Sequence, residues 1–219
     1  MEYIAVLSPL VGALVAGLFG KQIGDRGAQF ITCALMIAAA AASVMLFREI
    51  NMGDGQARTI ELFTWISSGD LNVKWALRFD QLSAVMAIVI TLVSTAVHIY
   101  SVGYMHHDPA QARFMSYLSL FTFAMLMLVT ADNFVQLFFG WEGVGLASYL
   151  LIGFWNQKDS ANAAAIKAFV MNRIGDFGLA LGIFAVFMTF GTLNFDEVFA
   201  QMAGKADSYS EFLGYHVHT

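Results

Sequence analysis

The chain has 219 residues, of which 58% are hydrophobic and 12% charged, and its net charge at pH 7 is −5. A soluble domain has about 25% charged residues, so the composition excludes a soluble globular enzyme and a disordered chain. A single cysteine, Cys33, excludes a disulfide scaffold, and the lack of a basic cluster argues against nucleic acid as a partner. The composition therefore indicates an all-α integral membrane protein.

Six stretches are long and apolar enough to cross a membrane as helices, which takes about 20 residues each. We expect these helices at residues 3–20, 28–47, 82–104, 112–131, 133–155 and 163–190. Basic residues in short loops mark the cytoplasmic side of a membrane protein. The odd-numbered loops contain the basic residues Lys21, Arg26, Arg113 and Lys158. The N-terminus is therefore expected outside, with these loops inside.

The segment 48–81 lies between the first two expected helices (residues 1–47) and the other four (residues 82–190), and it is expected on the outer face. From Leu71 to Asp80 apolar and polar residues alternate, which is typical of a half-buried strand. The run Thr59–Ile66 is also rich in β-forming residues, and Ser67-Ser68-Gly69-Asp70 has the composition of a turn. We expect a short β-hairpin, packed on the helices or on a partner subunit, because two strands alone are marginally stable.

Residues 191–219 follow the last expected span. The stretch Asn194–Gly204 has the pattern of a short amphipathic helix, with apolar residues on one face. The stretch Lys205–Thr219 is polar. We expect this part of the chain to lie outside the hydrocarbon core.

Charged side chains within the expected spans are the candidate functional groups. Each one near the bilayer centre costs at least about 2.5–3.5 kcal/mol to insert. Glu142 is the strongest candidate, because it lies about 14 Å into its span, close to the middle of the membrane. Three nearby glycines, at 140, 143 and 145, allow another helix to approach. Such a carboxyl group can take up and release a proton as its neighbours change, and the alternative is a static glutamate that locks two helices together.

Three further charges, Lys167, Arg173 and Asp176, lie in the last expected span. Arg173 and Asp176 are three residues apart, so they share a helix face and can pair directly. Lys167 points about 120° away from Arg173 and is placed to meet a different helix or to extend to the membrane surface. A line of ionisable groups across two helices suits proton transfer. For Arg173 the alternative is a structural ion pair with a neighbouring subunit.

His98, in the third expected span, is a further candidate for proton relay, because histidine titrates near neutral pH. The alternative is a hydrogen-bonded structural histidine. One cysteine cannot hold an iron–sulfur cluster, and the adjacent pair His106-His107 does not converge on one ion. We therefore expect no metal site and no cofactor in this chain.

Several stretches share their residues with one protein family. The most specific runs from Gly140-Trp141-Glu142-Gly143 to Phe154, and Asn172-Arg173-Ile174-Gly175-Asp176 follows it in the next span. Arg78–Ser83 and His98–Met105 fit an earlier helix of the same family. Together these stretches resemble subunit L, also called chain 5, of the proton-pumping NADH:quinone oxidoreductase, respiratory complex I.

The resemblance implies an antiporter-like subunit of the membrane arm, surrounded by membrane lipid, that translocates protons as part of an enzyme. It implies that Glu142 pairs with a lysine on a helix beyond Thr219, and that Asp176, Arg173 and Lys167 are channel or inter-subunit charges. NADH, FMN, the iron–sulfur clusters and quinone are expected in partner subunits of the membrane and peripheral arms. Because members of the family are longer, the chain is expected to be the N-terminal part of such a subunit.

Two alternatives remain open. The large subunit of the multisubunit sodium–proton antiporters shares these helices and moves cations without electron transfer. A non-pumping structural subunit would tolerate neutralisation of Glu142 and Asp176. The alanine- and glycine-rich spans favour a bacterial plasma membrane over the mitochondrial inner membrane.

Overall fold

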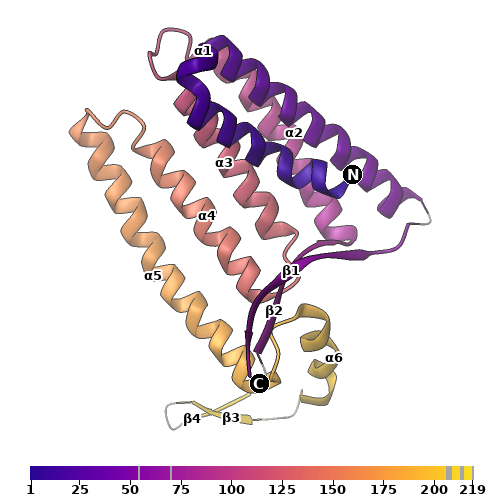
Figure 1. The fold of residues 1–219 in the computed structure, drawn as a ribbon. Helices are drawn as coiled ribbons and strands as arrows, with labels where there is room; N and C mark the ends of the chain where they lie inside the picture. Colours follow the sequence, from indigo (N-terminus) through magenta and orange to yellow (C-terminus); the bar gives the residue numbers. More distant parts are fainter. Residues whose placement is uncertain (54, 70, 206–208, 213–214, 219) are drawn as a thin grey trace.

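The computed structural model describes residues 1–53, 55–69, 71–205, 209–212 and 215–218. In this part of the chain, five helical stretches are long and apolar enough to cross a membrane. They contain α1 (Glu2–Phe47), α2 (Gln81–Tyr104), α3 (Gln111–Val129), α4 (Phe134–Ile152) and α5 (Asp159–Phe190). The helix α3 packs on α1, α2 and α4, and α5 packs on the far side of α4 (Figure 1). The expected bundle of membrane helices is confirmed.

The first two expected spans are joined within α1, without the loop that we expected at residues 21–27. Gly24 is the one residue inside α1 with non-helical angles, φ 70° and ψ 170°, a conformation that glycine adopts easily because it has no Cβ. The chain reverses there, so that α1 consists of two arms (Figure 1). The arms pack closely, since a Cβ on Gly12 would lie 3.7 Å from the Cα atom of Thr32. The two arms account for the difference between six expected spans and five long helical stretches.

Local signals set the ends of the helices. Asp80 caps α2 by accepting a hydrogen bond from the Ser83 backbone at 2.8 Å, while the Ser83 hydroxyl accepts one from the Asp80 backbone. Asn133 caps α4 by accepting a hydrogen bond from the Gln136 backbone at 2.9 Å. Gly191, with φ 72°, ends α5 in the left-handed conformation that is common after helices.

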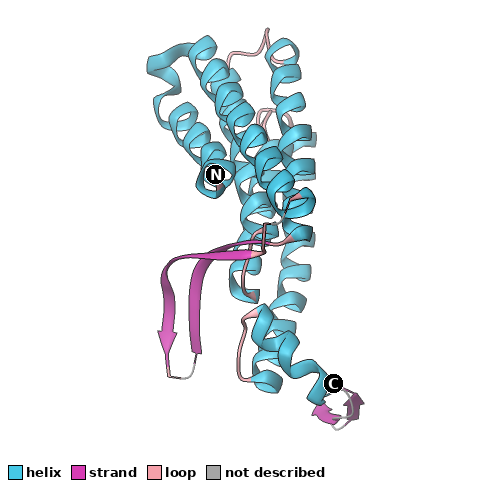
Figure 2. Ribbon diagram, turned by 90° about the vertical axis from the view of Figure 1, so that its right-hand side faces the viewer, coloured by secondary structure: helices cyan, strands magenta, loops and turns pink. Residues whose placement is uncertain are grey.

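The expected β-hairpin is confirmed, and it follows a short π-helix, η1 (Arg48–Met52), that we did not expect. Strands β1 (Arg58–Ser68) and β2 (Leu71–Phe79) pair antiparallel, and their far end extends away from the helices (Figure 2). Asp70 of the expected turn lies outside the described residues. The buried Leu77 and Phe79 join a core cluster with residues of α1, α2 and α3.

Backbone groups on the edge of β2 that faces away from β1 also form hydrogen bonds. The backbone N–H of Arg78 donates to the carbonyl of Thr130 at 2.9 Å, and the Asn133 side chain donates to the carbonyl of Lys74 at 2.8 Å. An open strand edge invites pairing with another chain. The connection between α3 and α4 covers this edge over part of its length and fixes the hairpin to the bundle.

The expected amphipathic helix is present as α6 (Phe195–Lys205). It is tied to the start of α4, because Phe134 N–H donates to the carbonyl of Leu193 and Phe195 N–H donates to the carbonyl of Asp132. Beyond it, β3 (Tyr209–Phe212) and β4 (Tyr215–His218) pair antiparallel in the segment for which we expected only a polar composition.

Candidate functional site

Charged residues of α4 and α5 meet between the two helices. Glu142 lies at the ninth of the 19 positions in α4, and its carboxylate forms an ion pair with the guanidinium of Arg173 in α5. The Nε atom of Arg173 also lies 3.3 Å from Oδ2 of Asp176, which confirms the expected pairing of these two residues. Arg173 is therefore held between two carboxylates.

Trp141 adds a second contact between the same helices. Its indole Nε1–H donates a hydrogen bond to Oδ1 of the buried Asp176 at 2.8 Å. Glu142, Arg173, Asp176 and Trp141 thus form one polar cluster, which we call the α4–α5 charge cluster. Trp141 was not among the residues expected to be functional. The available signal was an indole N–H in the middle of an apolar span, where it needs a partner.

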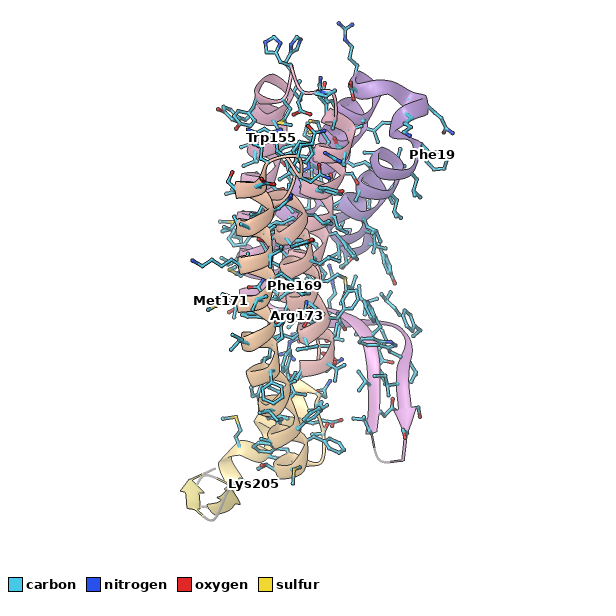
Figure 3. All side chains as sticks on the ribbon, turned by 90° about the vertical axis from the view of Figure 1, so that its left-hand side faces the viewer. Phe19, Trp155, Phe169, Met171, Arg173 and Lys205 are labelled. Atoms are coloured by element: carbon cyan, nitrogen blue, oxygen red, sulfur yellow. The ribbon has the colours of Figure 1, made fainter. Side chains whose placement is uncertain are left out.

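Aromatic rings pack beside the charge cluster. The guanidinium of Arg173 lies 4.8 Å from the ring centroid of Phe169, one turn earlier in α5. Phe169 in turn makes an edge contact with Tyr149 of α4, with 5.6 Å between the ring centroids. Figure 3 shows Phe169 and Arg173 toward α4 and Met171 on the other side of α5. A cation over an aromatic face is attracted to it, so Phe169 helps to hold Arg173 in place.

The glycines around Glu142 bring neighbouring helices close, as expected. A Cβ on Gly140 would lie 2.5 Å from the backbone of Leu128 in α3, and one on Gly143 would lie 2.9 Å from a side chain of the same helix. On the other side, a Cβ on Gly145 would lie 3.2 Å from the amide nitrogen of Asn172 in α5. Glu142 therefore lies where α4 is in tight contact with α3 and α5.

The other two candidates take no part in the α4–α5 charge cluster. Lys167 is exposed on α5 and makes no hydrogen bond or ion pair with the residues that the structure describes. His98 is fully buried in α2, where its Nδ1 lies 2.8 Å from the carbonyl of Ser94 and its Nε2 lies 3.0 Å from the hydroxyl of Ser119 in α3. His98 thus links α2 to α3, while its role in proton relay stays a prediction.

Two family profiles match the sequence. The family described as NADH-Ubiquinone oxidoreductase (complex I), chain 5 N-terminus, matches residues 65–115. The family described as NADH:quinone oxidoreductase/Mrp antiporter, TM, matches residues 131–217, a range that includes the whole α4–α5 charge cluster. The second description covers both complex I and the Mrp antiporters, so full-length relatives are needed to separate the two.

The relatives make this separation. The chain is 46% identical over 218 residues to NADH-ubiquinone oxidoreductase chain 5 from Chondrus crispus, and 49% identical over 222 residues to NADH-quinone oxidoreductase subunit L from Rhodobacter capsulatus. The chain belongs to the chain 5/subunit L family. The alignments cover 100% and 98% of this chain but 33% and 31% of the relatives, so the chain spans about a third of their length.

A solved structure confirms the antiporter-like fold of this family member. The Mrp complex from Dietzia sp. DQ12-45-1b superposes with a TM-score of 0.78 at 21% sequence identity. The match covers 93% of this chain and 21% of that chain. At this identity the likeness is evidence for the fold alone.

Proposed function

We propose that the chain is part of an antiporter-like membrane-arm subunit that translocates protons, while partner subunits carry out the electron transfer of an NADH:quinone oxidoreductase. The observation that carries the proposal is the position of Arg173, which is held between the carboxylates of Glu142 and Asp176 at the contact of α4 and α5, near the middle of both helices. Membership of the chain 5/subunit L family supports the same function.

The charge cluster suits a group that binds and releases protons. Two unit charges 4 Å apart interact by about 4 kcal/mol at an effective dielectric constant of 20. Movement of a cation to or from Glu142 therefore changes the electrostatic energy of its carboxylate by a similar amount. Arg173 has a second carboxylate within reach, so it stays paired when it leaves Glu142. A lysine on a further helix, which the family resemblance implies, then becomes the alternative partner of Glu142.

We also propose that this chain binds no redox cofactor. NADH, FMN, the iron–sulfur clusters and quinone are assigned to partner subunits of the membrane and peripheral arms. The bacterial plasma membrane is the proposed location, on the basis of the alanine- and glycine-rich spans.

A sodium–proton antiporter subunit is the second candidate. Its support is the profile shared between complex I and Mrp antiporters, together with the fold likeness to the Mrp complex. The relatives at 46% and 49% identity favour the first candidate, since both are named as NADH oxidoreductase subunits.

The test compares wild type with Glu142→Gln in the full-length subunit, by NADH-driven proton uptake into inside-out membrane vesicles. Complex assembly and NADH oxidation are recorded in the same vesicles. We expect an assembled complex whose proton uptake per NADH falls sharply. Unchanged uptake would make Glu142 a structural residue. Proton movement that is independent of NADH in wild type would favour the antiporter.

A further inference from the structure

Asp176 depends on a single hydrogen-bond donor. Its side chain is buried, and Trp141 Nε1–H is the only described group that donates a hydrogen bond to it. The second oxygen, Oδ2, makes no hydrogen bond among the described residues, although Arg173 Nε lies 3.3 Å away. A buried carboxylate without a donor is costly, so the indole N–H is the contact that fixes this oxygen.

The geometry of the cluster gives this hydrogen bond a wider role. Trp141 and Glu142 are consecutive in α4, and their partners Asp176 and Arg173 lie one turn apart in α5. Together the four residues close a ring of contacts between the two helices. The position of Asp176 therefore sets how far Arg173 can move from Glu142 while it remains paired.

At this position the N–H group of Trp141 matters more than the packing of its ring. In the isolated chain Trp141 is 46% exposed, whereas its N–H end reaches a buried carboxylate. Anchoring at the membrane surface, the usual role of tryptophan in such proteins, does not account for Trp141, because it is the eighth of 19 residues in α4. Neither packing nor surface anchoring explains a tryptophan here as well as its N–H does.

We propose that Trp141 is a positioning residue for proton translocation, which holds Asp176 and through it sets the position of Arg173 against Glu142. The inference rests on the proposed function and adds a residue to it. Trp141 does not exchange protons itself. Its loss leaves Asp176 without a hydrogen-bond donor, so the position of Asp176 is no longer fixed and its hold on Arg173 weakens. The charged groups around Asp176 are Arg173 on α5 and, through Arg173, Glu142 on α4.

The chain offers a matched control in Trp155. Its Nε1–H also donates to an aspartate, Asp108, at 2.8 Å, and the ammonium of Lys158 lies 4.8 Å from its ring centroid. Trp155 follows the end of α4, and it lies well away from Arg173 along the direction of the helices (Figure 3). Trp155→Phe therefore removes the same kind of hydrogen bond from a tryptophan–aspartate pair outside the spans.

The experiment measures proton uptake per NADH in assembled complex with the full-length subunit. We expect Trp141→Phe to lower the uptake severalfold, because Asp176 loses its hydrogen-bond donor, and Trp141→His, which keeps a ring N–H, to restore part of it. Trp155→Phe should match wild type. The double variant Trp141→Phe/Asp176→Asn should equal Asp176→Asn alone, because Trp141 acts through Asp176.

Other results overturn the inference. These are an uptake in Trp141→Phe equal to wild type, no recovery in Trp141→His, or a further loss in the Asp176→Asn background. If the Trp141→Phe subunit does not assemble, Trp141→His should still assemble and keep part of the uptake. Failure of both variants would indicate a packing role. A loss of uptake in Glu142→Gln without any effect of Trp141→Phe rejects this inference alone, whereas normal uptake in Glu142→Gln rejects the proposed function.

Discussion

Gln136 of α4 and Ala76 of β2 are joined by two hydrogen bonds. The Ala76 N–H donates to Oε1 of Gln136 at 3.0 Å, and Nε2 of Gln136 donates to the carbonyl of Ala76 at 2.6 Å. Both residues are fully buried. One side chain thus completes the edge of a strand and fixes the hairpin to the helix that carries Glu142.

Replacement of Gln136 by Ala should destabilise the subunit. The buried N–H and carbonyl of Ala76 would lose their partners, at about 1–3 kcal/mol for each group. We expect a lower midpoint of thermal unfolding in detergent and faster hydrogen exchange at Ala76. Asn72→Ala changes an exposed residue of the same strand and should leave both unchanged. An unaltered unfolding midpoint in Gln136→Ala would show that the two hydrogen bonds contribute little.

Gly140 should not tolerate a side chain. A Cβ at this position would lie 2.5 Å from both N and Cα of Leu128, and backbone atoms cannot move aside alone. We expect Gly140→Ala to force α3 and α4 apart, at about 1–3 kcal/mol or more, and to reduce the amount of assembled complex. Gly182→Ala is the control, because outside the local backbone of α5 no atom of the described residues lies within 4 Å of its Cβ position. Equal assembly of the two variants would contradict the close contact between α3 and α4.

Asp80 should make stability depend on acidic pH. Burial raises the pKa of its carboxyl, but the hydrogen bonds from Ser83 and the charge of Arg78 outweigh burial and hold the pKa below its ordinary value of 3.8. The unfolded chain therefore binds this proton more readily than the folded chain. The stabilisation is present above about pH 4 and is lost as the pH falls through the folded-state value.

The variant Asp80→Asn isolates this contribution, because asparagine keeps the helix cap but has no charge. Unfolding measured from pH 7 to pH 3 should show wild type more stable than Asp80→Asn near neutral pH. The difference between the two should shrink below about pH 4. A difference that stays constant over the whole range would mean that the charge of Asp80 does not stabilise the folded subunit.

Arg173 should matter more than Lys167 for proton uptake. Arg173→Gln leaves two carboxylates without a shared cation, so we expect a severalfold fall in uptake per NADH in assembled complex. Arg173→Lys should restore part of it, because one ammonium cannot contact both carboxylates in the fork geometry of a guanidinium. Lys167→Gln should lie closer to wild type, since Lys167 makes no polar contact with the described residues. A larger fall in Lys167→Gln than in Arg173→Gln would instead assign the functional charge to Lys167.

The local patterns of the sequence predicted most elements correctly. Hydrophobic runs located the spans, alternation located β2, and the spacing of three residues paired Arg173 with Asp176. These predictions succeed because each depends on residues within a few turns of one element. The reversal near Gly24 was expected, but the continuation of the helix through it was missed, because the residues at 21–27 combine charge and glycine in the way that loops do.

The residue pattern alone indicates that this chain crosses a membrane, where its helices lie, and that Glu142 is in the middle of one of them. The partners of the charged and polar groups follow from the fold: Arg173 for Glu142, Trp141 for Asp176, and Gln136 for the backbone of Ala76. Each of these contacts joins two different elements. Their existence depends on how one element is rotated and shifted against the next, and packing between elements sets that rotation rather than any local pattern of residues.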